Sequence, residues 1–369
     1  MTWSLAFSLF VGVRLAAELW LAARQRTSVL THRNIVPAAF TETIALETHQ
    51  KAADYTVARL NIGMVGDFVG SIVLLGWTVA GGLNWLHTLW TSVSLPGYAQ
   101  ATGVALSLLV ITSLVSLPLS LWRTFGIEAR FGFNRTTFAT FLQDLVKQLI
   151  LALALGTPLL AIVFWLTESA GELWWMYVWG VWSGFGLLIS WAYPRFIAPI
   201  FNKFSPLDNA ELKSRIEALL ERCHFKSSGV FVMDGSTRSS HGNAYFAGMG
   251  KTKRIVFFDT LLETLNADEV EAVLAHELGH FRLRHVHKRL TLSLILSFVG
   301  LWIAGWLVTI PAFQSSFGIQ TPTLGVALIL FTLVAPVATF FISPFFSAVS
   351  RKHEFEADAF AVKQSAGTS

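Results

Sequence analysis

The sequence is poor in charged residues and in cysteine. Asp, Glu, Lys and Arg make up only 14% of the 369 residues, whereas 53% are hydrophobic, including 30 Phe and 14 Trp. This composition excludes an ordinary soluble enzyme and indicates a polytopic membrane protein. The single cysteine, Cys223, excludes a disulfide framework, and we expect a buried or partly buried thiol there.

Other common signals are also missing. We find no internal repeat, no low-complexity tract and no nucleic-acid-binding motif, so the formal net charge of +4 is ascribed to loops that face anionic lipid. The first apolar segment lacks a preceding basic region and is interrupted by Arg14 and Glu18, so no cleaved signal peptide is expected. These two residues are four apart and are predicted to pair, facing other helices or an aqueous cavity.

Seven apolar stretches are long enough to cross a hydrocarbon core, which takes about 20 residues. Lys and Arg are absent from residues 60–122, 148–194 and 290–350, so three alternate connections carry no positive charge. By the positive-inside rule, the N-terminus is outside and the basic connections face the cytoplasm. The predicted spans are residues 5–23, 64–86, 99–122, 145–166, 174–193, 290–310 and 324–347.

The run His276-Glu277-Leu278-Gly279-His280 carries the chemistry. On a helix, the two histidines lie one turn apart and can bind one Zn²⁺, with Glu277 beside the metal as general base. A helix is expected because residues 266–269 read as an N-cap followed by its acidic partner. The pattern is typical of a zinc metallopeptidase.

A third protein ligand is expected in residues 351–358. Glu354 and Asp358 are one turn apart there, so one can bind the metal while the other orients a ligand histidine. His353 and Glu356 are rival ligands, and spacing does not choose among the four. An antiparallel hairpin of the last two spans would return this segment to the membrane face that carries His276 and His280.

Residues 202–286 have the composition of a small globular unit. We predict a helix over residues 207–224 and strands over 229–233, 243–248 and 253–259. A strand beside a zinc helix often holds a peptide substrate in extended form, although a plain hairpin that only packs the helix is the alternative.

Several runs together resemble the Ste24-type CAAX prenyl proteases, the integral-membrane zinc peptidases of the M48 group, and suggest a bacterial homologue. The similarity extends upstream to Phe131-Gly-Phe-Asn134 and to Tyr193-Pro194 with Ile197-Ala-Pro-Ile-Phe-Asn202. The runs are Ser239-Ser-His-Gly-Asn-Ala-Tyr245, Lys253-Arg-Ile-Val-Phe-Phe-Asp-Thr-Leu261, the motif at 276–280 and Glu354-Phe-Glu-Ala-Asp358.

The resemblance implies a mainly α polytopic fold, with about seven transmembrane helices around a chamber and a small cytoplasmic α+β zincin-type protease domain. By motif position it implies Glu354 as the third metal ligand and Asp358 as a residue that supports the metal ligands without binding the metal. It also implies that Asn243, Ala244 and Tyr245 lie beside the substrate. Family members usually continue into a His-Pro segment whose histidine resembles an oxyanion stabiliser. This sequence ends at Ser369 without that segment, so we expect a truncated chain or a protein that lacks it.

We therefore expect a zinc-dependent endopeptidase that cuts near the C-terminus of prenylated CAAX-type or other membrane-associated substrates. One Zn²⁺ would be held by His276, His280 and Glu354, and Glu277 would activate the water. Peptide or protein substrates and membrane lipid are the expected partners, without nucleic acid. The expected domains are residues 1–195 (spans one to five), 196–289 (protease), 290–350 (spans six and seven) and 351–369 (third-ligand helix).

The expected location is a bacterial cytoplasmic membrane, or the endoplasmic reticulum membrane in a eukaryote, with the active site facing the cytoplasm. A bacterial quality-control protease without prenyl specificity is one alternative function. A zinc-regulated transporter or scaffold is another, but structural zinc sites use Cys freely, and Cys223 is far in sequence from the histidines.

Overall fold

The computed structural model describes residues 2–247 and 253–365, which form two compact units. The first unit comprises Met1–Asn134, Ala152–Val178 and Leu301–Ile342, and the second comprises Arg135–Leu151, Trp179–Gly300 and Ser343–Ser369. Three helices run from one unit into the other: α5 (Phe138–Ser169), α6 (Trp174–Ala192) and α11 (His285–Leu307).

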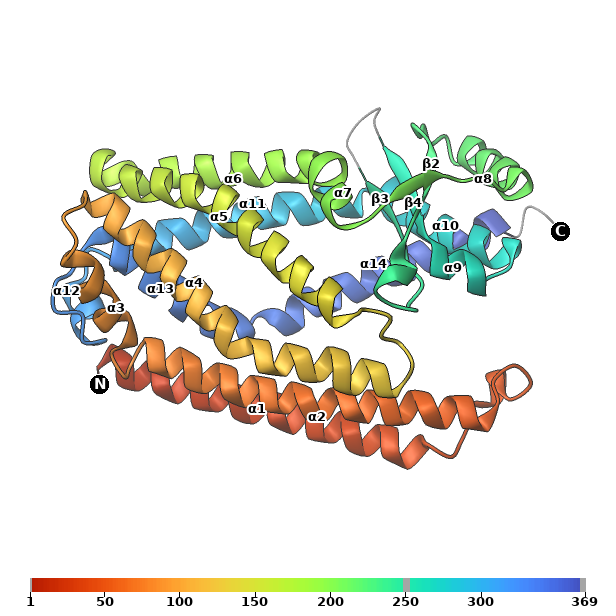
Figure 1. Ribbon diagram of the computed structural model, residues 1–369, viewed down its shortest axis with the longest axis horizontal. Coiled ribbons are helices and arrows are strands. Elements are labelled where there is room, and N and C mark those ends of the chain that lie inside the picture. The colour runs from red at the N-terminus through yellow and green to blue at the C-terminus, as the bar shows by residue number, and fades with distance from the viewer. Residues whose placement is uncertain (1, 248–252, 366–369) are drawn as a thin grey trace. The chain divides into compact units, whose positions relative to one another are not determined.

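The first unit is helical. Its two longest helices, α1 (Trp3–His32) and α2 (Leu46–Trp77), pack along each other (Figure 1). The predicted pair is confirmed in α1, where Arg14 Nε lies 2.9 Å from Glu18 Oε1. Further elements of this unit are η1 (Ala38–Phe40), α3 (Gly82–Thr91), α4 (Gly97–Leu121), the π-helical η2 (Trp122–Glu128), η3 (Gly171–Leu173), α12 (Pro311–Ser315) and α13 (Leu324–Phe340).

Six helices among the described residues are long and apolar enough to cross a membrane, or seven if one bent pair counts as a span. The predicted bounds of the second span, 64–86, are wrong. The helix α2 starts at Leu46 and ends at Trp77, and the chain then turns at Gly81, whose φ of 84° is readily adopted only by glycine. Hydropathy missed this extent because the first turns of α2 carry Lys51, Asp54 and Arg59, which lower the local average.

The seventh span, predicted as one stretch over 324–347, consists of two helices. The helix α13 ends at Phe340, and α14 (Ser343–Ser365) follows at an angle of 65°. Proline disfavours helical geometry at the residue before it, and Pro344 stands in the first turn of α14, so the break falls just ahead of it. As a result, α14 carries the chain directly into the segment with the predicted third ligand.

The second unit contains a four-stranded sheet in the order β1-β2-β4-β3. The strands β1 and β2 are antiparallel, β2 and β4 are parallel, and β3 is antiparallel to β4, with Ala244 opposite Phe257. The sequence predicted three of the four, β2 (Val230–Met233), β3 (Ala244–Ala247) and β4 (Arg254–Phe258), while Gly248 of the predicted third strand lies outside the described residues. It missed β1 (Phe204–Pro206), which is too short to show a pattern.

One hydrophobic core joins this sheet to helices α8 (Ala210–Arg222) and α10 (Ala267–Arg282). The side chain of Asn209 caps α8 by accepting from the backbone N–H of Leu212 at 3.0 Å. Fully buried residues from both helices and the sheet, such as Ile216, Leu274 and Phe257, meet in the core. The remaining short elements are η4 (Tyr193–Ile197), α7 (Ala198–Phe201), η5 (Gly235–Thr237) and α9 (Asp259–Thr264).

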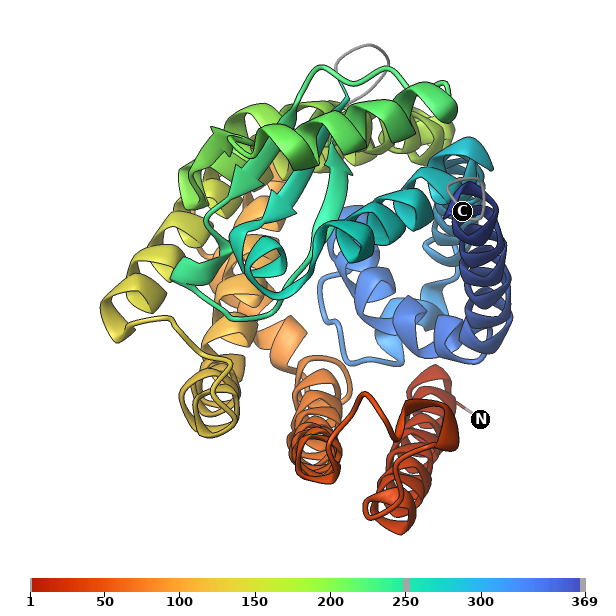
Figure 2. The same ribbon diagram turned by 90° about the vertical axis from the view of Figure 1, so that its right-hand side faces the viewer.

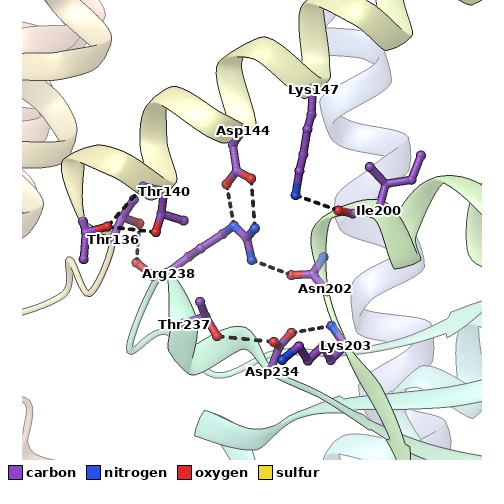
Figure 3. Close-up of polar contacts among 11 residues, drawn as sticks. Thr136, Thr140, Asp144, Lys147, Ile200, Asn202, Lys203, Asp234, Thr237 and Arg238 are labelled. Atoms are coloured by element: carbon purple, nitrogen blue, oxygen red, sulfur yellow. Dashed lines mark hydrogen bonds and ion pairs between the residues drawn. The ribbon is translucent and has the colours of Figure 1, made fainter.

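A polar network fixes the loop that precedes β3 (Figure 3). Arg238 donates from Nε and Nη2 to the two carboxylate oxygens of Asp144 in α5, at 2.7 and 3.0 Å, and from Nη1 to Asn202 at 3.1 Å. Its carbonyl oxygen accepts from the N–H of Arg135 at 3.0 Å. The bond to Asp144 raises the pKa of Arg238, so this two-pronged ion pair anchors the start of β3 to α5.

Candidate metal centre

The helix α10 places two histidines on one face. Its N-terminus has the predicted capping box, which is confirmed: Asn266 accepts from Glu269 N–H at 3.0 Å, and Glu269 accepts from Asn266 N–H at 2.8 Å. One turn separates His276 from His280, and their Nε2 atoms lie 3.2 Å apart. The helix is therefore anchored at its start and converges two imidazoles at its end.

Gly279 lets a second helix approach this face. The helices α10 and α14 run side by side (Figure 1, Figure 2), although they are far apart in the sequence. A Cβ on Gly279 would lie only 3.0 Å from the Cα and 3.1 Å from the carbonyl oxygen of Ala357. A side chain here would require the two backbones to move apart by a few tenths of an ångström, so glycine favours the close approach that brings Glu354 of α14 to the two histidines.

The three side chains have the spacing of a metal site. Glu354 Oε2 lies 3.4 Å from the Nε2 atom of His276 and 3.4 Å from that of His280. Zinc bonds of about 2.0–2.1 Å at tetrahedral angles place ligand atoms about 3.3–3.4 Å apart. The three atoms thus fit one face of a zinc tetrahedron and leave its fourth corner open.

A hydrogen bond to Asp358 fixes the tautomer of His276. The Nδ1 atom of His276 lies 2.8 Å from Asp358 Oδ1. Because a carboxylate only accepts, Nδ1 must carry the proton, and Nε2 then presents a lone pair toward Glu354 and His280. Asp358 thus lies where it can orient a metal-binding imidazole without itself joining the three-atom group.

His285 does the same for His280, and sequence reasoning missed it. Its Nδ1 atom lies 3.0 Å from Nδ1 of His280, and its Nε2 atom lies 2.9 Å from Glu356 Oε2. The carboxylate accepts from His285 Nε2–H, so His285 Nδ1 must accept from His280 Nδ1–H, which leaves the lone pair on His280 Nε2. A chain of two hydrogen bonds therefore connects Glu356 through His285 to the proposed ligand His280.

The position of His285 follows from a turn that spacing cannot reveal. The helix α10 ends at Arg282, and Arg284 adopts a left-handed conformation with φ of 58° before α11 begins at His285. On a continuous helix, a residue five positions after His280 would point well away from it. The available signal was only a third histidine shortly after the motif.

The two rival ligands lie in a neighbouring cluster. His353 stacks on His285 with ring centroids 4.0 Å apart, and Glu356 bonds to the same ring. His285, His353 and Glu356 form a second group of potential ligand atoms, distinct from His276, His280 and Glu354. The helical position of each residue on α14 thus separates Glu354 from its rivals.

Glu277 follows the first histidine and is partly buried. Burial raises the pKa of its carboxyl above the ordinary value, the charge of Glu354 acts in the same direction, and the two histidines oppose both effects. A carboxylate with a raised pKa accepts a proton more readily, which suits a general base.

The predicted substrate residues lie at a sheet edge. Among the described residues, β3 pairs with β4 on one side only, so its other side is free to pair with an extended peptide. Asn243 is exposed, and its Oδ1 accepts from the N–H of Ala244 at 2.8 Å. Ala244 is buried, and burial raises the pKa of Tyr245 to about 12, with its hydroxyl 3.9 Å from the sulfur of Met233.

Long apolar helices and a His-His-Glu group with an adjacent glutamate define the class as a membrane-embedded metallopeptidase. The chain belongs to peptidase family M48, in its CAAX prenyl protease branch. Residues 25–203 match the profile "CAAX prenyl protease N-terminal, five membrane helices", and residues 206–368 match the profile of peptidase family M48.

Relatives and a solved structure are similar over nearly the whole chain. The "CAAX prenyl protease 1 homolog" of Arabidopsis thaliana is 33% identical over 96% of this chain and 85% of its own length. The "CAAX prenyl protease 1" of Saccharomyces cerevisiae is 31% identical over 98% of this chain and 85% of its own length. The crystal structure of S. mikatae Ste24p superposes with a TM-score of 0.90 at 29% identity, covering 98% of this chain and 89% of that one.

These similarities support an integral, multi-pass membrane protein, mainly helical, with six to seven span helices and a small α+β protease domain. Family M48 membership makes it a metallopeptidase, and the His-His-Glu group is its candidate metal site. The three relatives just described are eukaryotic, so the expected bacterial origin has no support among them.

Proposed function

We propose that this protein is a zinc-dependent CAAX prenyl endopeptidase that cleaves prenylated proteins near their C-terminus. The observation that carries the proposal is the triangle of His276 Nε2, His280 Nε2 and Glu354 Oε2, with edges of 3.2 to 3.4 Å and Glu277 next in sequence. Membership of the M48 family and the names of the relatives, which are CAAX prenyl proteases, support the same substrate class.

The proposed roles divide metal binding from proton transfer. His276, His280 and Glu354 would hold the ion, while Asp358 and His285 keep the histidine lone pairs directed at it. When bound, zinc would supply an acidified water and polarise the scissile carbonyl. Glu277 would take the proton from the attacking water and deliver it to the leaving amine.

The free edge of β3 is the proposed peptide seat. Main-chain pairing to an edge strand holds an extended peptide in register without reading its side chains. Asn243 stands just before this edge and would contact the peptide backbone, while Ala244 and Tyr245 contribute main-chain groups.

The charge pattern suggests which side of the membrane the site faces. Since basic connections flank the protease region, we place the active site in the cytoplasm, on the endoplasmic reticulum membrane of a eukaryote or the cytoplasmic membrane of a bacterium. We assign the spans to residues 1–195 and 290–350, the protease domain to 196–289 and the third-ligand helix to 351–369.

A fluorogenic farnesylated CAAX peptide tests the proposal. The purified protein in detergent should cleave it next to the prenylated cysteine, a chelator should abolish cleavage, and added Zn²⁺ should restore it. Cleavage of unprenylated membrane-protein segments at an equal or greater rate would support a quality-control protease instead. No cleavage of either substrate by the zinc-loaded protein would contradict a peptidase function.

A further inference from the structure

A groove of about 770 Å³ lies between α11 and α14, within the second unit. Its apolar wall comes from Leu292 and Leu296 on α11 and from Phe346 and Val349 on α14. Leu292 and Leu296 are four residues apart, and Phe346 and Val349 are three apart, so each helix contributes two neighbouring apolar side chains, with Ser293, Ser297 and Ser350 beside them in the lining.

One end of the groove reaches the metal centre. His353 lines it, precedes Glu354 in the sequence and stacks on His285, which in turn bonds to His280. This end of the groove is therefore connected to the proposed metal ligand His280 through one intervening side chain, His285.

The groove has a suitable length for an isoprenoid. Its α11 wall runs from Lys288 to Ser297, which corresponds to about 14 Å of helix. This is on the scale of an extended farnesyl chain, which is apolar, unbranched apart from methyl groups and without charge.

We propose that this groove binds the isoprenyl chain of the substrate. The inference rests on the proposed function, because it places the prenylated cysteine beside the scissile bond. A lipid bilayer is more apolar than the groove, so burial alone does not favour the groove, which must select the chain by packing against Phe346 and the two leucines.

An anionic phospholipid is the competing occupant. Lys288 and Arg289 line the same groove, and within residues 2–247 and 253–365 neither forms an ion pair with an acidic side chain. A phosphate headgroup would suit them, but both residues lie within about one turn of His285, at the same end of the groove as His353. A headgroup bound there would occupy the end nearest the metal centre, where the prenylated cysteine and its peptide must lie in the substrate, so the two occupants exclude each other and we assign the groove to the substrate.

A groove-filling variant tests the proposal. Leu296→Trp narrows the groove, whereas Ile295→Trp places the same side chain one residue away on α11, at an exposed position outside the groove. The substrates are a farnesylated CAAX peptide and the same peptide carrying an S-methyl group.

We expect Leu296→Trp to lower the ratio of kcat/KM for the farnesyl over the methyl peptide by about tenfold or more, mainly through KM. Ile295→Trp should leave this ratio unchanged, and both variants should keep wild-type zinc content. Equal ratios in the two variants would overturn the groove proposal and leave the peptidase function intact. Failure of the wild-type protein to cleave either peptide would count against the proposed function itself.

Photolabelling of the wild-type protein provides a second test that needs no variant. A CAAX peptide whose isoprenoid ends in a diazirine should label residues in 288–297 and 346–353, and excess farnesyl peptide should suppress the label. Labelling confined to other helices, or suppression by anionic vesicles but not by farnesyl peptide, would contradict the proposal.

Discussion

Glu277 and Glu354 are both glutamates of the metal centre, but the proposed roles separate them. Glu277→Gln keeps the three ligand atoms and removes the base, so zinc content should stay near one per chain while turnover falls by about two to four orders of magnitude. Glu354→Ala deletes a ligand, so zinc affinity and activity should fall together. Metal analysis and peptide cleavage on the same samples check both outcomes, and loss of zinc from the Gln variant would contradict the assignment.

The raised pKa of Glu277 predicts a pH-dependent cost to stability. Between its ordinary and its raised pKa, the folded metal-free chain binds more protons than the unfolded chain, so stability falls as pH rises through that window and stays lower above it. Gln at this position carries no such charge. We expect metal-free Glu277→Gln to melt at a higher temperature than wild type at pH 7, and the difference to vanish below about pH 4. Thermal melts across pH measure it.

Because hydrogen bonds connect Glu356 through His285 to His280, substitution of His285 should lower zinc affinity although no zinc ligand is removed. His285→Phe removes both nitrogen contacts, so His280 is no longer held as the Nδ1–H tautomer, and zinc affinity should fall by about 10- to 100-fold in competition with a chelator. His353→Phe is the matched control, because it keeps a ring stacked on His285 and should leave zinc affinity unchanged. A large loss in the control would reinstate His353 as a ligand.

Part of this site could be anticipated from the sequence. Spacing on one helix brings His276 and His280 together, because a helix repeats every 3.6 residues. The choice of Glu354 over His353 and Glu356 depends on how α14 is rotated against α10, which is set by packing at Gly279 and Ala357. The role of His285 depends on a left-handed residue between two helices, and periodicity cannot register such a turn.

At the scale of helices, the close contact between α10 and α14 depends on the absence of a side chain at Gly279. Gly279→Ala would force Cβ to within 3.0–3.1 Å of the backbone of Ala357, so the helices must separate. We expect a loss of about 1–3 kcal/mol in unfolding free energy and a weaker zinc site. Chemical unfolding and zinc titration measure the two effects.

A helical glycine with open surroundings provides the control. A Cβ on Gly63 of α2 would meet no atom within 4 Å, so Gly63→Ala should leave zinc affinity unchanged and should not destabilise the protein. Equal effects of the two substitutions would show that Gly279 serves helix flexibility and not close packing.

Hydropathy predicted the long apolar helices well but not their ends. It measures the preference of a window of residues for lipid, and it placed both ends of α4 and α6 within two residues, whereas α5 begins at Phe138, seven residues before the predicted start at 145. It shortened α2, whose charged first turns extend the same helix, and it joined α13 to α14 because a bend at a proline changes direction and not composition.

At the scale of the whole molecule, the distribution of Lys and Arg predicts the orientation in the membrane. Single cysteines introduced in residues 91–98, 168–172 and 313–321 should react with an impermeant reagent added outside the cell, whereas those in 32–54 and 202–251 should not. The native Cys223 is 8% exposed, and burial raises its thiol pKa, so it adds little background. Outside labelling of the second group would move the active site to the opposite compartment.

One helix, α14, bears the groove residues Phe346 and Val349, the stacked His353 and the carboxylate of Glu354. Because these groups share one helix, a movement of α14 on filling the groove would also move Glu354, and the proposed groove and metal centre would then be thermodynamically linked. Linkage is reciprocal: the factor by which zinc changes the affinity for an isoprenyl chain must equal the factor by which that chain changes the affinity for zinc. The lipid tail of a substrate would then act as a heterotropic effector of the metal site.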